Sequence, residues 1–349
     1  MIRRRLSPRC VLLSLAAALL LTACASAQPA RPWSTSLAWG RDVVLGREPG
    51  GTAVGPLAIA AGTDVMVLAD SFGHRLLLWR RNRGTWQGPV KRGIPTRAAI
   101  VAVAVAPTGS DALAVAADAA GGVWTVPVAG PVRLLAELRA PRGDFRSVTA
   151  LAVAPNGMAV VDAVDIGAEH SERLLIAVTP SGSVRVLGAA SIAHGSPQER
   201  ANGLPPLLGA RGVRDGLASC SAGGVWAAVR GPGLSSGSLV CLDGSGRVLR
   251  RRPLPALRPP ADFLGVDRQG RAVAVEGAGT ASASVVVFGV HGRARSLLPA
   301  PRGAGPLLPH PAALAPDGAL LLLTADPGGV RLTRLPQGWR VPIGVAPAA

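Results

Sequence analysis

Apolar residues in this chain fall in short runs of strand length, and each run ends at a turn signal. A second apolar run follows most of these turns, and no segment repeats its apolar residues with a helical period. Two short apolar runs joined by a tight turn predict a β-hairpin. The clearest first runs are residues 100–106, 148–154 and 312–315, which lead into turns at Gly109, Gly157 and Gly318.

This hairpin unit recurs six times along the chain. Successive turn glycines lie 47, 48, 66, 47 and 48 residues apart. Repeats of about 40 to 50 residues that hold four short antiparallel strands are typical of β-propeller blades. We therefore predict an all-β fold, a six-bladed β-propeller of four-stranded antiparallel blades over residues 37–349. The turn glycines are Gly62, Gly109, Gly157, Gly223, Gly270 and Gly318.

The first strand of each unit is apolar on both of its faces. Val103 and Val105, for example, alternate with Ala102, Ala104 and Ala106. A sheet with one face in water would alternate apolar with polar residues instead. This pattern suits inner strands that are sandwiched between blades and crowded around an axis.

One terminal segment has to close the ring, because an open ring exposes strand edges. Residues 37–45 and residues 339–343 are the two candidates for the closing strand.

The N-terminal segment has the pattern of an export signal. Four arginines within the first nine residues precede an apolar run, residues 11–21, which ends in Leu21-Thr22-Ala23-Cys24. This arrangement resembles the signal of bacterial lipoproteins, and the resemblance implies that residues 1–23 are removed and that Cys24 is attached to lipid. Residues 11–21 are too few to span a bilayer as a helix. We expect residues 24–36, rich in Ala, Ser and Pro, to form a flexible tether to the outer face of a bacterial membrane.

Composition adds limits to this picture. Removal of residues 1–23 leaves 326 of the 349 residues and lowers the net charge from +17 to +13, because four arginines are lost. Tyrosine is absent and phenylalanine occurs four times, so the aromatic platforms that bind single-stranded nucleic acids are scarce. The basic clusters Arg80 to Arg83 and Arg250 to Arg252 are short and fall near predicted strand ends, where solvated arginines are expected. We predict no nucleic-acid partner.

Cys220 and Cys241 form an even pair once Cys10 and Cys24 are set aside, and an oxidising compartment favours a disulfide between them. They fall, however, on the first and third predicted strands of one blade. Two strand spacings separate such strands by about 9 to 10 Å, beyond the roughly 7 Å between Cα atoms that a disulfide bridges. The sequence therefore leaves open whether Cys220 and Cys241 form a disulfide or stay as free thiols.

Residues 65–76 carry a family resemblance. They resemble the core of an NHL repeat, with Asp70 after the second strand and Arg75 at the start of the third, and they are also similar to the six-bladed group that includes SMP-30-like lactonases and strictosidine-synthase-like proteins. The resemblance implies a six-bladed propeller over residues 50–345. The acidic position recurs without the arginine, and we interpret it as turn chemistry. It is occupied by Asp118, Asp162, Glu276 and Asp326.

The candidate site comes from the residue that stands eight positions before each turn glycine, where an inner strand begins at the tunnel mouth. The last three blades place Asp215, Asp262 and His310 there, whereas the first three place Val54, Val101 and Thr149. Two carboxylates and an imidazole could bind a cation or act as acid and base. The alternative is that these residues cap strand ends and face water.

Our leading hypothesis is a non-catalytic binding or scaffolding propeller for an envelope protein or polymer, with Asp215, Asp262 and His310 as ligand-binding residues. An insertion in residues 190–212 is expected at the same mouth, as a lid or docking loop. We assign no catalytic residue, metal ligand or cofactor. The alternative is a metal-dependent lactonase or esterase of the SMP-30 type. That resemblance implies Ca²⁺ bound by Glu, Asn and Asp, but only Asp215 and Asp262 fall at suitable positions.

Overall fold

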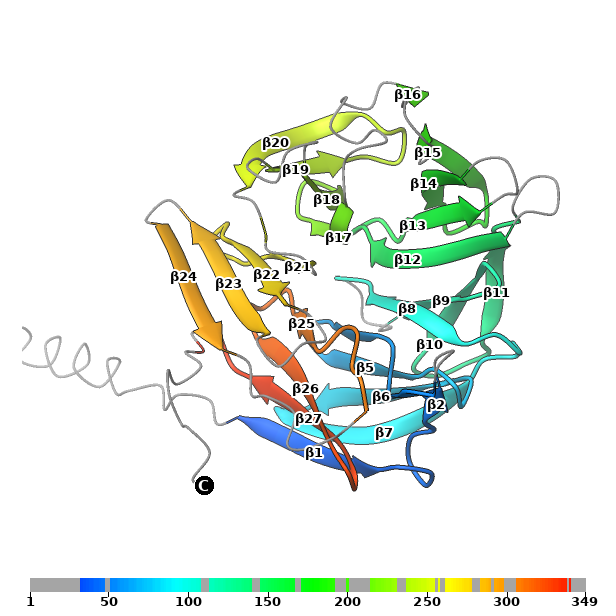
Figure 1. Ribbon diagram of the computed structural model, residues 1–349, viewed down its shortest axis with the longest axis vertical. Coiled ribbons are helices and arrows are strands. Elements are labelled where there is room, and N and C mark those ends of the chain that lie inside the picture. The colour runs from blue at the N-terminus through cyan, green and yellow to red at the C-terminus, as the bar shows by residue number, and fades with distance from the viewer. Residues whose placement is uncertain are drawn as a thin grey trace, which may run out of the picture. The chain divides into compact units, whose positions relative to one another are not determined.

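The fold is a six-bladed β-propeller, as the sequence predicted, and it lies in one compact unit, Trp33–Ala349. Figure 1 shows its six sheets arranged as blades around a common centre. The computed structural model describes residues 32–47, 51–107, 113–139, 145–166, 171–191, 199–200, 214–230, 237–254, 257, 261–277, 283–289, 292–297, 306–337 and 339. Among these residues, no helix is long and apolar enough to cross a membrane.

Each of the first three blades is an antiparallel meander whose strands pair in chain order. The first blade contains β4 (Ile59–Ala61), β5 (Val65–Asp70), β6 (Arg75–Asn82) and β7 (Thr85–Gly93). The second contains β8 (Ile100–Val105), β9 (Leu113–Asp118), β10 (Gly122–Pro127) and β11 (Arg133–Glu137). The third contains β12 (Phe145–Val153), β13 (Ala159–Ile166), β14 (Ser171–Val178) and β15 (Val184–Ser191), with β16 (Glu199–Arg200) added at its edge.

The fourth and fifth blades repeat this order, and the sixth differs in its outer strand. The fourth contains β17 (Arg214–Cys220), β18 (Gly224–Arg230), β19 (Gly237–Leu242) and β20 (Val248–Leu254). The fifth contains β21 (Ala261–Val266), β22 (Ala272–Glu276), β23 (Ser284–Gly289) and β24 (Gly292–Leu297). The sixth contains β25 (Ala312–Leu314), β26 (Leu320–Asp326), β27 (Gly329–Leu335) and β1 (Trp33–Ala38), and a separate pair is formed by β2 (Gly46–Arg47) and β3 (Ala53–Val54).

The inner strands form a closed ring, in which β4, β8, β12, β17, β21 and β25 each contact the next and β25 contacts β4. Their two faces pack against different blades. In β8, Val103 belongs to the apolar cluster shared with the first blade, whereas Ala102 and Ala104 belong to the cluster shared with the third. This two-sided burial is the physical reason for the apolar pattern that predicted the fold.

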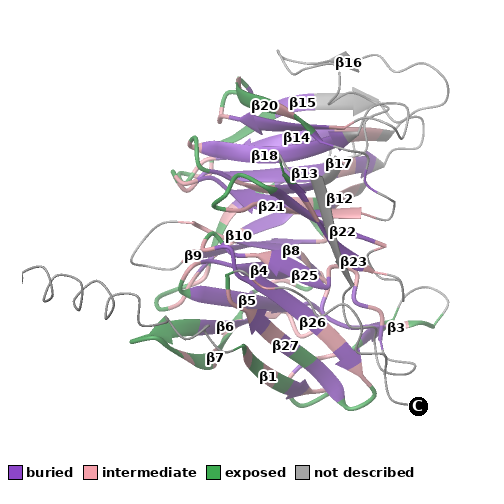
Figure 2. Cartoon of the chain, turned by 90° about the vertical axis from the view of Figure 1, so that its left-hand side faces the viewer, coloured by how far each residue is buried: buried purple, intermediate pink, exposed green. Residues whose placement is uncertain are grey.

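Burial falls from the axis to the rim of each blade. The second strands β5 and β22 are buried along their whole length, whereas the outer strands β7 and β20 are mostly exposed or half-buried. Figure 2 shows the same gradient, with exposed residues on β7. The outer strands therefore carry most of the polar residues of the blades.

The N-terminal strand β1 closes the ring as the outermost strand of the sixth blade. It pairs antiparallel with β27, from Trp33 opposite Arg334 to Ala38 opposite Gly329. Trp33 also lies against Trp79 and Trp86 of the first blade, with ring centroids 6.1 and 6.2 Å apart. The closure therefore combines backbone pairing to the last blade with aromatic contacts to the first.

The closing strand differs in position from the prediction of residues 37–45. Residues 33–36, which we assigned to the flexible tether, are paired within β1. Their side chains alternate, because Ser34 and Ser36 are exposed while Trp33 and Thr35 are half-buried. The Ala, Ser and Pro content of the segment obscured this alternation. Of the other candidate, residues 339–343, Trp339 lies outside any strand and the rest lies outside the described residues.

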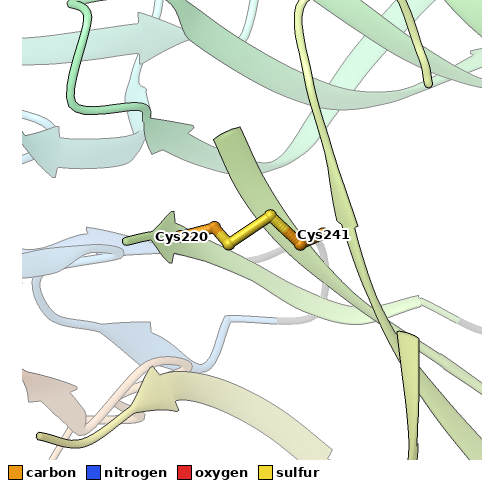
Figure 3. Close-up of a disulfide and its surroundings, with 2 residues drawn as sticks. All are labelled: Cys220 and Cys241. Carbon is orange, nitrogen blue, oxygen red and sulfur yellow. A yellow bond between two sulfur atoms is a disulfide. The ribbon is translucent and has the colours of Figure 1, made fainter. Parts of the chain in front are cut away.

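Cys220 and Cys241 form a disulfide across the fourth blade (Figure 3). Their Cα atoms are 6.2 Å apart, so the separation of about 9 to 10 Å that we expected from strand spacing is wrong. Cys220 is the last residue of β17, where the chain turns at residues 221–223. A residue at a strand end is not held at the full two-strand separation, which explains why the bridge fits.

We predict that Leu37→Ala destabilises the protein by about 2 to 5 kcal/mol, the usual cost of removing a buried leucine side chain. Leu37 is 4% exposed and packs in the core cluster shared by the first and sixth blades. The matched control is Leu45→Ala, since Leu45 is 37% exposed. Urea unfolding of both variants measures the difference. Equal unfolding free energies would contradict the role of β1 as the closing strand.

Candidate functional site

A cavity of about 1080 Å³ runs through the centre of the propeller and is lined by the inner strands of all six blades. Alanine and valine dominate its wall, because larger side chains would not fit where six strands converge. The wall consists of residues 58–61, 101–105, 149–153, 216–219, 261–266 and 312–316.

The inner strands run in the same direction along this cavity, which gives it two different mouths. At one mouth the strand starts lie together, since His310, just before β25, contacts Asp262 in β21. At the other mouth the hairpin turns lie together, since Arg268 donates a hydrogen bond to the carbonyl of Pro316. We call these the start-side mouth and the turn-side mouth. Five to six residues of extended strand separate them, or about 17 to 20 Å.

A β-bulge marks the start-side mouth in three consecutive blades. The extra residue is Val101 in β8, Thr149 in β12 and Asp215 in β17, because the pairing register shifts at each of these positions. They are the residues that the turn-glycine count predicted for this mouth. In β21 the bulge falls instead at Leu264, and Asp262 keeps a regular partner, Val275. Bulges redirect side chains at the rims of closed sheets.

Asp262 and His310 form a hydrogen-bonded ion pair across the fifth and sixth blades. Nδ1 of His310 lies 2.8 Å from Oδ2 of Asp262. The Asp262 side chain is 17% exposed and that of His310 is 39% exposed, so the pair reaches solvent through the imidazole. Both residues line the cavity.

The charge of Asp262 raises the pKa of His310 above the usual value for histidine; burial opposes this effect, and the hydrogen bond that Nδ1 of His310 donates to Asp262 adds to it. The folded pKa therefore lies above that of histidine in the unfolded chain. The ion pair stabilises the folded protein at pH below about 6.5, and this contribution is lost as pH rises through the raised pKa.

Asp215, the third predicted residue, is the bulged residue of β17; nothing of its side chain is described. Its neighbour Gly216 lies directly against Asp262. A Cβ atom on Gly216 would be 2.8 Å from the carbonyl oxygen of Phe263 and 3.3 Å from Oδ1 of Asp262, and its φ of 136° also favours glycine. The backbone therefore brings Asp215 beside the Asp262–His310 pair.

The described residues do not fit a calcium ion at this mouth. Ca²⁺ takes six to eight oxygen ligands, whereas the pair offers one carboxylate that is already bound to an imidazole. Within the part of the chain that the structure describes, no group of three or more His, Cys, Asp or Glu side chains could hold a metal ion.

Two of the periodic acidic residues, Asp118 and Asp326, fix turns, as we interpreted them. Oδ1 of Asp118 accepts hydrogen bonds from the backbone amides of Ala120 and Gly122, and Oδ1 of Asp326 accepts those of Gly328 and Gly329. Such contacts fix the turns at the ends of the second strands.

Our interpretation that the arginine partner is lost after the first blade is wrong for the third. Arg75 binds Asp70 with 2.7 Å between Nε and Oδ2, and Arg173 binds Asp162 with 2.8 Å between Nη2 and Oδ2. Arg173 follows its aspartate by eleven residues instead of five, because β13 continues past Asp162 to Ile166 and β14 begins before Arg173, at Ser171. Arg173 and Gly216 both line the cavity. Sequence reasoning identified neither of them as a site residue.

No protein-family model and no curated protein sequence matches the chain. Two solved structures are similar to it in fold. One is a gluconolactonase from Xanthomonas campestris, with 18% identity, 88% of this chain and 100% of that chain covered, and a TM-score of 0.46. The other is a luciferin-regenerating enzyme, with 11% identity, 88% and 96% covered, and a TM-score of 0.46.

We predict that His310 titrates above the usual histidine pKa, and that Asp262→Asn lowers its pKa because the charge is lost while the burial stays. The measurement is an NMR titration of the histidine Cε1–H signals, with His310 assigned from His310→Gln. His74 of the first blade, whose ring lies 3.0 Å from the carbonyl of Ala98, is the internal control. An unchanged His310 pKa in Asp262→Asn would contradict the ion pair.

Proposed function

We propose that the protein is a non-catalytic binding module, anchored on the outer face of a bacterial membrane, whose start-side mouth binds an envelope protein or polymer. The observation that carries the proposal is the Asp262–His310 pair at the mouth of the central cavity. Its ligand is a segment rich in hydroxyl and amide groups, or a cationic group.

The pair leaves hydrogen-bonding atoms open to a ligand. Among the described residues, no hydrogen bond reaches Oδ1 of Asp262 or Nε2 of His310, and the imidazole is partly exposed. Because the pKa of His310 is raised, Nε2 is a donor at low pH and an acceptor at high pH. A few polar atoms set in an apolar concave wall are typical of ligand sites.

The carboxylates make the local charge differ from the average charge of the chain. The whole sequence is strongly basic, with a net charge of +17. At the start-side mouth, Asp262 is paired with His310 and Arg173 with Asp162, and the backbone of β17 brings Asp215 to the same end of the cavity. This mouth therefore favours neutral polar or cationic groups over anions.

Two observations support the proposed location on the outer face of a bacterial membrane. The lipoprotein-type signal ends at Cys24, and Trp33 begins β1 nine residues later, so an extended connection spans at most about 30 Å. The Cys220–Cys241 disulfide suits an oxidising compartment outside the cytoplasm. We propose that residues 1–23, which lie outside the described residues, are the cleaved signal and that membrane lipid is attached through Cys24.

A hydrolase is the second candidate, and a specific contact favours it. Asp262 holds Nδ1 of His310, which leaves Nε2 directed away from that contact, as in a general base oriented by a carboxylate. Hydrolysis of a simple lactone by the purified protein, measured with and without a chelator, tests this alternative. Activity that His310→Gln abolishes and the chelator leaves intact would support a metal-independent hydrolase.

We predict that Cys24→Ala releases the protein from the membrane or leaves it unprocessed. The reason is that the thioether-linked lipid requires the cysteine sulfur. Fractionation of cells, with the mass of the purified N-terminus, measures both outcomes. A variant that stays in the membrane fraction with the wild-type mass would rule out the lipid anchor, and Ala25→Gly is the neighbouring control.

We predict that Asp215→Asn combined with Asp262→Asn abolishes binding of chitotriose, a probe rich in hydroxyl and amide groups. The melting temperature should shift by no more than a few degrees, because asparagine keeps the size of aspartate and its amide oxygen still accepts a hydrogen bond from Nδ1 of His310. Calorimetry measures binding. Asp64→Asn, an exposed carboxylate on the turn of the first hairpin, is the control. Undiminished binding by the double variant would rule out the site.

A further inference from the structure

The turn-side mouth of the cavity carries a cluster of arginines. Arg250 and Arg252 of β20 and Arg268 in the hairpin turn of the fifth blade all line the cavity. From the sequence we assigned Arg250 to Arg252 to solvated strand ends, and Arg250 is indeed exposed. The tertiary structure adds that these residues face the same cavity as Arg268, which comes from another blade.

Backbone and aromatic contacts hold two of these side chains in place. Nη1 of Arg252 donates to the carbonyl of Gly270, and its guanidinium lies 5.6 Å from the centroid of the Trp226 ring. Nε of Arg268 donates to the carbonyl of Pro316 at 3.2 Å. These contacts use one donor of each guanidinium and leave the others open, because a guanidinium has five N–H donors.

One carboxylate lines this end of the cavity: Asp267 acts electrostatically on Arg252, but it is already paired with another arginine. Arg251 also lines the cavity and adds a further positive charge. Other arginines of the chain are paired with acids: Arg75 with Asp70, Arg173 with Asp162, and Arg334 with Asp317. The acid closest in sequence to the cluster, Asp267, is bound by Arg271 at 2.7 Å and also accepts the amides of Gln269 and Arg271. An excess of positive charge therefore remains at this mouth.

The spacing of the arginines suits a multivalent anion. Arg250 and Arg252 are two residues apart on one strand, so they project from the same face at about 6.6 to 6.8 Å. Cys241 lies directly opposite Arg250 on the neighbouring strand and shares this face, as does the contact of Arg252 with the Trp226 ring. Guanidinium groups bind the oxygens of phosphate through paired hydrogen bonds.

We infer that the turn-side mouth is an anion site for a phosphate group, held by Arg250, Arg252 and Arg268. The phosphate comes either from a free phosphate ion or from the headgroup of a phospholipid. The site is separate from the start-side mouth, which has the opposite local charge. At the turn-side end of the central cavity, guanidinium groups thus outnumber carboxylates.

The test is calorimetric titration of the full chain in a non-ionic detergent with inorganic phosphate and with glycerophosphoglycerol, the soluble headgroup of phosphatidylglycerol. Arg250→Gln combined with Arg268→Gln should weaken phosphate binding by about tenfold or more, because each charge-assisted hydrogen bond contributes roughly that factor. Binding of inorganic phosphate alone assigns the site to the free ion, and tighter binding of the headgroup assigns it to phospholipid.

The charge-matched control is Arg80→Gln combined with Arg81→Gln, which removes two exposed arginines from the first blade. It should change the affinity by no more than about twofold, because these residues lie far from the cavity mouth and act only through screened charge. Arg250→Lys with Arg268→Lys keeps the charge but loses paired hydrogen bonding, and should give an intermediate affinity. No phosphate binding by the wild type, or equal losses in both Gln pairs, would overturn the inference. Asp262→Asn should leave phosphate binding unchanged, so this site and the proposed start-side site can fail separately.

Discussion

The pairing of β1 with β27 is the interaction on which the rest of the structure depends. A propeller blade cannot bury both of its faces alone, so each of the six blades needs a neighbour on either side. The backbone hydrogen bonds from Trp33 to Ala38 hold the start of the propeller to its last blade, and Trp33 reaches the first blade at the same time. Without this closure, the sixth and first blades would expose apolar faces, and the six inner strands would no longer surround one cavity.

Crowding around the axis then determines the chemistry of that cavity. Because inner strands meet closely, small apolar residues occupy most of the wall, and polar groups appear only where strands begin and where they turn. The bulges at Val101 and Asp215 lie at the beginning of their strands and that at Thr149 in the middle of β12, and Asp262 and His310 meet at the start-side mouth. Arg268 and the β20 arginines occupy the turning end. A polar contact site at each mouth follows from this arrangement.

The two mouths suit ligands of different chemistry. A start-side mouth with carboxylates and an imidazole suits neutral polar or cationic groups, and its hydrogen-bonding state changes as His310 titrates. A turn-side mouth with guanidinium groups suits phosphate. The charge of each mouth therefore predicts its ligands better than the net charge of the chain does.

The sequence by itself determined the fold class, the number of blades and the starts of most strands. Two-sided burial leaves a repeated apolar pattern, and turns at fixed spacing leave glycines such as Gly157 and Gly318, which adopt positive φ angles. The sequence also placed Asp215, Asp262 and His310 at equivalent positions in their repeats. Local patterns of this kind are visible because each residue's environment repeats from blade to blade.

Only the tertiary structure decided which of these residues touch. The contact of Asp262 with His310, the pairing of Arg173 with Asp162 within the third blade, and the joint position of Arg252 and Arg268 depend on how strands and blades pack. The same holds for the Cys220–Cys241 disulfide, which ideal strand spacing argued against and a strand end permits. The repeat spacing along the sequence determines where a residue lies in its own blade. The distance between side chains of different strands depends instead on twist, bulges and turns, which the repeat spacing does not encode.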